Sequence, residues 1–275
     1  MKRYSVLIAV AVFVLSLAGC TTAPSPGSTG KSRPVTNAAD VQIIEMISGE
    51  KESSYRVEAL LPTTDLSSVG QPLADKISQE WDEFDSMTKE QQRTSSKLWG
   101  VVDIQTDTWD DCEEAIGFAL YNPLETLDWL SKTGYFGMES VDSHAPTAHV
   151  QVTANTAQTA DRKPGEVSAI AGYKDDDVRI TLAATVSSST ESFSTGSVYT
   201  GYATYEQNTV TTGSGTTVLI VTVNGTNNIG YYDGDYFDFT AYWVKDNVFY
   251  ALRVFGNETD KAEIQATLDK LLAEI

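Results

Sequence analysis

The fold is indicated most clearly by residues 236–255, which read YFDFTAYWVKDNVFYALRVF. Two runs rich in aromatic and β-branched residues flank a turn at 245–247, a composition typical of two antiparallel strands joined by a tight hairpin. Successive side chains of a strand point to opposite faces, so we expect one apolar face of the first strand to line the core. The apolar set is Phe237, Phe239, Ala241 and Trp243, and the opposite set is Tyr236, Asp238, Thr240 and Tyr242.

Similar β-rich runs, separated by polar turns, fill the C-terminal half. The predicted strands are residues 149–155, 166–173, 178–187, 198–208, 216–224, 236–245 and 248–255. Their short connections predict an antiparallel meander, because parallel pairs need long crossovers. An amphipathic helix from about Thr259 ends the chain and should cover this sheet with its apolar stripe.

The preceding part of the chain is more helical in pattern. Residues 67–97 predict one helix with Leu73, Ile77, Trp81 and Phe84 on its core face. A strand is expected over 98–104, and Thr108 with Asp111 predicts the cap of a short helix. Residues 41–61 fit either a helix or a strand. The sequence therefore predicts a single α+β domain over 40–275, helix-rich in 40–146 and β-rich in 147–275.

The N-terminus has the layout of a cleavable export signal, residues 1–19. A basic pair precedes an apolar run over 6–17, which is shorter than the roughly 20 residues needed to span a bilayer. Leu17-Ala18-Gly19-Cys20 resembles the lipobox of bacterial lipoproteins. This resemblance implies cleavage between Gly19 and Cys20 and a lipid on the Cys20 thiol, whose two acyl chains would hold the protein stably.

The segment over 20–39 begins at the expected lipidated cysteine and is rich in Thr, Pro, Ser and Gly, a composition typical of a flexible tether. We expect the protein on the extracytoplasmic face of the cell membrane. In a Gram-negative host, Thr21 would permit delivery to the outer membrane.

Composition limits the partners. The formal charge of the chain is −19, and a field of this sign repels nucleic acid. The expected contacts are the membrane, through the lipid, and an unidentified protein or small-molecule ligand. No cofactor motif is found, so none is expected.

One further resemblance concerns residues 99–275. The short acidic helix at 109–116, with Gly117 and Asn122-Pro123 after it, resembles a group of uncharacterised Gram-positive lipoproteins. Their C-terminal module, also found in anti-sigma-factor-like membrane proteins, ends in a tryptophan strand, a tight turn, an aromatic strand and a helix. Residues 243–252 and the helix from Thr259 are the counterparts here. The resemblance implies an extracytoplasmic domain of unknown function with no assigned catalytic residues.

The residues offer little support for catalysis. Cys112 lies among four acidic residues, which should suppress its thiolate. Two acidic turns carry oxygen ligands of the kind that calcium prefers, but neither matches an EF-hand loop, so solvated acidic turns are the preferred interpretation. These calcium candidates are Asp175, Asp176, Asp177, Asp233, Asp235 and Asp238.

Tyrosines are concentrated in the β-rich half, and on an exposed sheet face they would suit a sugar, a peptide or a protein. The candidate binding residues are Tyr199, Tyr202, Tyr205, Tyr236 and Tyr242. Cross-strand packing is the alternative role for these rings. We therefore expect a non-enzymatic binding or interaction module. The alternatives are a carrier with an apolar cavity between sheet and helices, and an envelope hydrolase with two converging acids of raised pKa.

Overall fold

The fold is described from a computed structural model, which describes residues 41–48, 52–60, 63–133, 150–157, 161–188, 191–198, 203–227, 234–257 and 261–275. The elements in chain order are β1 (Val41–Ser48), β2 (Glu52–Leu60), α2 (Gln71–Ser86), α3 (Lys89–Thr94), the 3-10 turn η1 (Ser96–Trp99), β3 (Val101–Thr106), α4 (Trp109–Ile116), β4 (Ser131–Thr133), β5 (Val150–Asn155), β6 (Glu166–Asp175), β7 (Val178–Ser187), β8 (Glu191–Val198), β9 (Ala203–Thr211), β10 (Thr217–Asn227), β11 (Gly234–Lys245), β12 (Val248–Asn257) and α5 (Lys261–Glu274).

The predicted α+β class is confirmed, with a nine-stranded antiparallel sheet and a C-terminal helix. The strand order is β3-β5-β6-β7-β12-β11-β10-β9, and β4 pairs with β6 at the side of this path. Two meanders, β5 to β7 and β9 to β12, meet where β7 pairs with β12. The sheet is therefore not one continuous meander, because β8 leaves it after β7.

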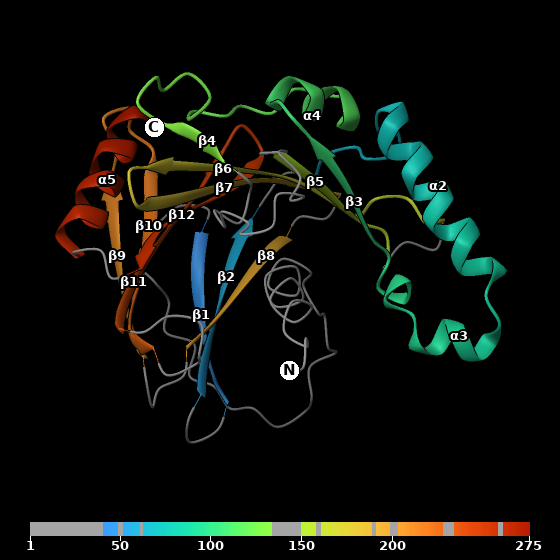
Figure 1. Cartoon of the computed structure of the whole chain (residues 1–275), viewed down its shortest axis with the longest axis horizontal. Helices are drawn as coiled ribbons and strands as arrows, with labels where there is room; N and C mark the ends of the chain where they lie inside the picture. Colours follow the sequence, from blue (N-terminus) through green and yellow to red (C-terminus); the bar gives the residue numbers. More distant parts are fainter. Residues whose placement is uncertain are drawn as a thin grey trace, which may run out of the picture.

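A second, three-stranded sheet has the order β1-β2-β8. It settles the open assignment of 41–61, since both segments there are strands. The single strand expected over 198–208 is wrong: β8 ends at Val198 and β9 begins at Ala203, so two strands of different sheets meet there. In Figure 1 this small sheet lies on the opposite side of the large sheet from α4, and it contacts β7, β9 and β11.

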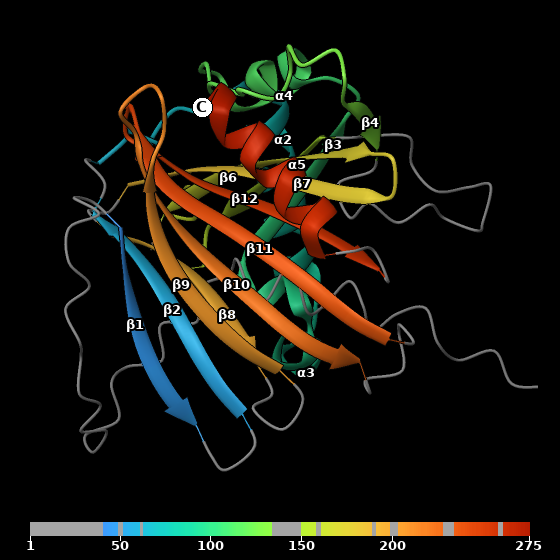
Figure 2. The ribbon, with the colours of Figure 1, turned by 90° about the vertical axis from the view of Figure 1, so that its left-hand side faces the viewer.

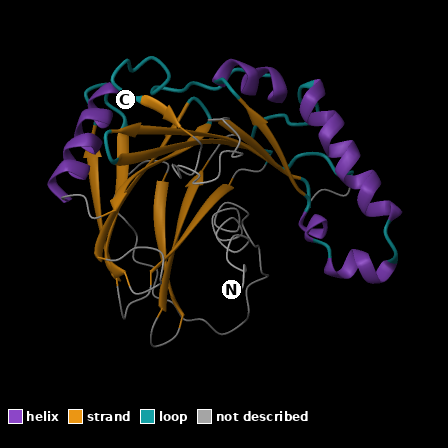
Figure 3. Cartoon of the chain, viewed as in Figure 1, coloured by secondary structure: helices purple, strands orange, loops and turns teal. Residues whose placement is uncertain are grey.

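The helices pack on the outer side of the strands (Figure 3). Figure 2 shows α5 lying across the strands β11, β12 and β7, which it contacts. The hydrophobic core fills the space between this side of the large sheet and the helices, and the predicted core residues Phe239, Ala241 and Trp243 belong to it. Phe237 is only partly buried and packs at its margin.

The helix predicted over 67–97 is broken in two. Met87 is extended at the end of α2, and Thr88 begins α3 with a capping box to Gln91. Leu73, Ile77 and Phe84 are buried as expected, whereas Trp81 is only partly buried. The cap predicted at Thr108 is confirmed, because its hydroxyl accepts from the Asp111 amide at the start of α4.

The segment over residues 109–123 has clear structural roles. The Trp109 indole donates to the Leu120 carbonyl at 2.7 Å, and the Asn122 amide donates to the Tyr173 hydroxyl at 2.8 Å. Gly117 ends α4 in the left-handed conformation, against Gly70 at the start of α2. These contacts fix α4 and the segment after it on the large sheet.

Candidate functional site

The two faces of the large sheet are built differently. The outer face carries the apolar core. We call the opposite side, toward β1, β2 and β8, the inner face; we define it by the residues Asp103, Gln105, Gln151, Thr153, Glu166, Ser168, Ile170, Ala183, Thr185, Ser187, Leu219, Asp238, Tyr242, Phe249, Ala251 and Arg253. Several of its polar side chains are buried, among them Gln151, Ser168 and Thr185.

Polar side chains form one row across four strands of the inner face. Asp103, Thr153, Ser168 and Thr185 are successive cross-strand partners on β3, β5, β6 and β7. The Thr153 hydroxyl donates to the Asp103 carboxylate at 3.0 Å, and the Ser168 and Thr185 hydroxyls lie 2.8 Å apart. Buried hydroxyls of this kind remain only where they are hydrogen-bonded. The row supplies donors and acceptors inside the protein.

A second row crosses all eight strands of the main path and changes in character along its length. It runs from Gln105 through Gln151, Ile170, Ala183, Ala251, Tyr242 and Leu219 to Thr209. Its middle is buried and mostly apolar, while Gln105 and Thr209 at its ends are exposed. The inner face therefore reaches solvent at both edges of the sheet.

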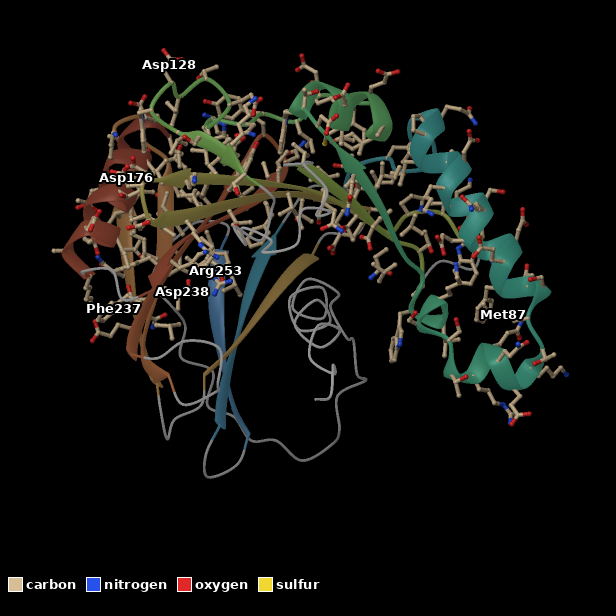
Figure 4. All side chains as sticks on the ribbon, in the orientation of Figure 1. Met87, Asp128, Asp176, Phe237, Asp238 and Arg253 are labelled. Carbon is tan, nitrogen blue, oxygen red and sulfur yellow. The ribbon has the colours of Figure 1, made fainter. Side chains whose placement is uncertain are left out.

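An ion pair between Arg253 and Asp238 places two opposite charges on the inner face. The Arg253 guanidinium bonds to Asp238 through Nε at 2.6 Å, and it lies 4.4 Å from the centre of the Phe255 ring. Figure 4 shows the two side chains together on the side of the large sheet where β1 lies. Asp238, one of the calcium candidates, is thus engaged in an ion pair with Arg253.

The remaining calcium candidates fall into two groups. Asp175, Asp176 and Asp177 form the turn between β6 and β7, with Asp176 in a positive-φ conformation and both Asp176 and Asp177 exposed. Asp233 lies outside the described residues, as does the side chain of Asp235. Within the described residues, no group of three or more acidic, histidine or cysteine side chains is placed to hold a metal.

Only one of the five candidate tyrosines has a described side chain. Tyr242 is 4% exposed and stacks on Phe249 of the next strand, with ring centres 5.9 Å apart. Tyr242 therefore fits the alternative role, cross-strand packing, and not an exposed binding surface. Tyr199 and Tyr202 lie outside the described residues, as do the side chains of Tyr205 and Tyr236.

Two carboxyls of the inner face have a raised pKa. Burial raises the pKa of Glu166 to about 7, and no described group bonds to it. Burial also raises the pKa of Asp103, against the opposing effect of the Thr153 hydroxyl. Neither carboxyl contributes to the pKa shift of the other, so they do not form the coupled pair that the hydrolase alternative requires.

Cys112, the cysteine within the described residues, is not a nucleophile at neutral pH. Burial, aided by the charge of Glu113, raises the pKa of the Cys112 thiol to about 12, so it stays protonated at neutral pH. Cys20 and Gly19 lie outside the described residues. None of the described helices has the length and apolar character to cross a bilayer.

One feature was missed from the sequence. Leu98 was assigned to a strand, but β3 begins only at Val101, and Leu98 and Trp99 lie in η1 with exposed fractions of 49% and 58%. Gly100, in the left-handed conformation, ends this turn. The pair Trp99-Gly100 after a capping serine was the available sign of a turn.

Comparison with protein-family models, curated proteins and solved structures finds no match to this chain. The lipoprotein resemblance therefore stays a prediction, and the functional argument depends on the site itself.

Proposed function

We propose that this protein is a lipid-anchored extracytoplasmic binding protein, without catalytic activity, whose ligand lies on the inner face of the large sheet. One observation carries this proposal: two hydrogen-bonded pairs, half-buried Asp103 with Thr153 and buried Ser168 with Thr185, lie in one cross-strand row on the side away from the hydrophobic core. A sheet needs only one apolar face for stability, so polar groups placed among the buried side chains of this second face favour a role in recognition.

The character of the inner face supports a ligand with both polar and apolar groups. The polar row offers hydrogen bonds, and the buried, stacked pair Tyr242 and Phe249 forms an apolar part of the same face beside it. Binding sites commonly combine mostly apolar walls with a few placed polar groups. A sugar or a short peptide meets this description, and a purely hydrocarbon ligand would leave the hydroxyls without new partners.

The alternative function, a carrier of a hydrophobic ligand, expects an apolar cavity between the large sheet and the helices. The side chains between the large sheet and the helices form a packed core in which Leu182, Leu252 and Leu268 have no exposed surface. A cargo would have to use the inner face as well. The anchor at Cys20 is supported by the sequence alone.

The test compares two pairs of hydroxyls. Ser168→Ala with Thr185→Val removes a buried pair whose members bond to each other, and loss of both partners together costs little stability. The matched control, Thr212→Val with Ser214→Ala, removes an exposed pair at 3.0 Å in the turn before β10. We expect native mass spectra of chain isolated from its host membranes in mild detergent to show an adduct in wild type and control.

The inner-face variant should lose most of that adduct while its thermal midpoint stays near wild type. An adduct that is equally abundant in all three proteins, or absent from all three, would contradict the proposed site.

A further inference from the structure

The segment from Lys89 to Trp99, comprising α3 and η1, is an ordered arm outside the core. Neither element has a buried residue. The arm is nevertheless held in place: the Gln92 amide donates to the Phe84 carbonyl at 2.9 Å, and Lys97 pairs with Glu80 and Glu83 of α2. Order without burial indicates that the arm is maintained for a contact outside the described domain core.

The end of the arm presents apolar side chains to solvent. Trp99 is 58% exposed, whereas Trp109 and Trp243 are 3% and 1% exposed. Leu98 beside it is 49% exposed, and both belong to a turn fixed by the Ser95 cap and by Gly100. Trp and Leu held outward in this way suit the boundary between headgroups and acyl chains, where an indole finds both apolar and polar surroundings.

The arm differs from the rest of the chain in the sign of its formal charge. Residues 87–100 contain three basic side chains and one acidic side chain, a formal +2 in a chain of −19. Lys97 is engaged by α2, but within the described part of the chain no carboxylate pairs with Lys89 or Arg93. The exposed acids Asp110, Asp111 and Glu114 are on α4, and Figure 1 shows α3 at the far end of α2 from α4. At the end of α2 next to α3, Glu83 pairs with Lys97 and Asp85 with Arg162, and Asp82 is exposed.

We propose that this arm docks on the phospholipid bilayer that holds the Cys20 anchor, with Leu98 and Trp99 in the interface and Lys89 and Arg93 on lipid phosphates. The inference rests on the anchored protein proposed above. An acidic body is repelled by anionic headgroups, so the molecule would turn this basic arm, with its exposed apolar side chains, toward them. The anchor keeps the bilayer close, so even a weak contact is populated.

The experiment uses the full, lipid-bearing chain in vesicles of phosphatidylcholine with a minor share of phosphatidylglycerol. Acyl chains carrying bromine quench an indole that enters the interface. We expect them to quench about one of the five tryptophans. Trp99→Phe should abolish the quenching, whereas the matched control Trp129→Phe, which removes a half-buried indole beneath Lys270, should retain it. Lys89→Gln with Arg93→Gln should reduce the quenching severalfold.

Quenching that is the same in wild type and Trp99→Phe, in protein that floats with the vesicles, overturns the docking arm alone and leaves the anchor and ligand site standing. Protein that does not float overturns the anchor and the arm together. Protection of Trp99 from iodide in native membranes, without bromine quenching in pure lipid, would identify a protein partner and overturn the bilayer contact.

Discussion

Carboxyl groups of this protein lie in two opposite environments at the scale of single residues. Lys97 and Lys76 hold the pKa of Glu80 below its ordinary value, and Arg162 does the same for Asp85. Among the described residues Glu166 has no such partner, and burial raises its pKa to about 7. Its cross-strand neighbours Asn155 and Ser187 carry no charge. Neutral pH therefore favours ionisation of this group at a cost to the folded state.

The sign of this effect gives a pH prediction. Because the pKa of Glu166 is higher in the folded protein than in the unfolded chain, the contribution of Glu166 to stability is greatest below the unfolded value of 4.5 and falls as pH rises toward 7. Each pKa unit corresponds to about 1.4 kcal/mol, and partial exposure reduces the effect to the order of 1–3 kcal/mol. Glu166→Gln should flatten this part of the curve. Urea unfolding at pH 5 and pH 8 measures the difference; an equal decline in both proteins would contradict the assignment.

Local signals account for what could be predicted at the scale of elements. Thr108 and Asp111 lie together in the chain, so the cap of α4 is readable from sequence. The same kind of signal, Thr88 with Gln91, starts α3 but lies inside an apolar pattern that continues to look helical. Tyr242 shows what the alternation of side chains along a strand cannot predict. Alternation gave its face correctly, but not the layer that covers it, because β1 and β2 have no clear period of their own.

The contact between α2 and α4 gives a prediction at the same scale. A Cβ at Gly70 would lie 2.3 Å from the Glu114 carbonyl oxygen and 2.5 Å from that of Ala115, both of them backbone atoms that cannot turn aside. Gly70→Ala should therefore force the two helices apart and destabilise the protein by about 1–3 kcal/mol. Gly213→Ala, where nothing lies within 4 Å, is the matched control. Thermal unfolding compares them, and equal midpoints would exclude the close approach.

The whole molecule is three layers deep: the helices, the large sheet and the small sheet. The C-terminal half was predictable because tight turns join its neighbouring strands, as Asp246 and Asn247 join β11 to β12. The pairing of β7 with β12 and the departure of β8 depend on long-range packing, which local patterns do not encode. The polar row was equally hidden, since its four residues come from four separate strands.

The anchor is a prediction about the whole molecule. Cys20→Ser removes the only thiol at the expected cleavage site, and we expect an uncleaved precursor without lipid. The mature wild-type protein should contain a single free thiol, Cys112, which is buried and reacts with iodoacetamide only after denaturation. Mass spectrometry of both proteins reads cleavage and lipid directly. Normal processing of the variant, or two free thiols in the mature wild-type protein, would contradict the proposed lipid anchor.

The pairing of β7 with β12 also bears on the order in which the protein is made. Ile180 pairs with Val254, so the pairing at the centre of the large sheet forms only after the intervening strands β8 to β11 have been synthesised. Until then the earlier meander has an open edge and no partner for it. The central pairing therefore forms late relative to the first meander, an order that would suit the export proposed above.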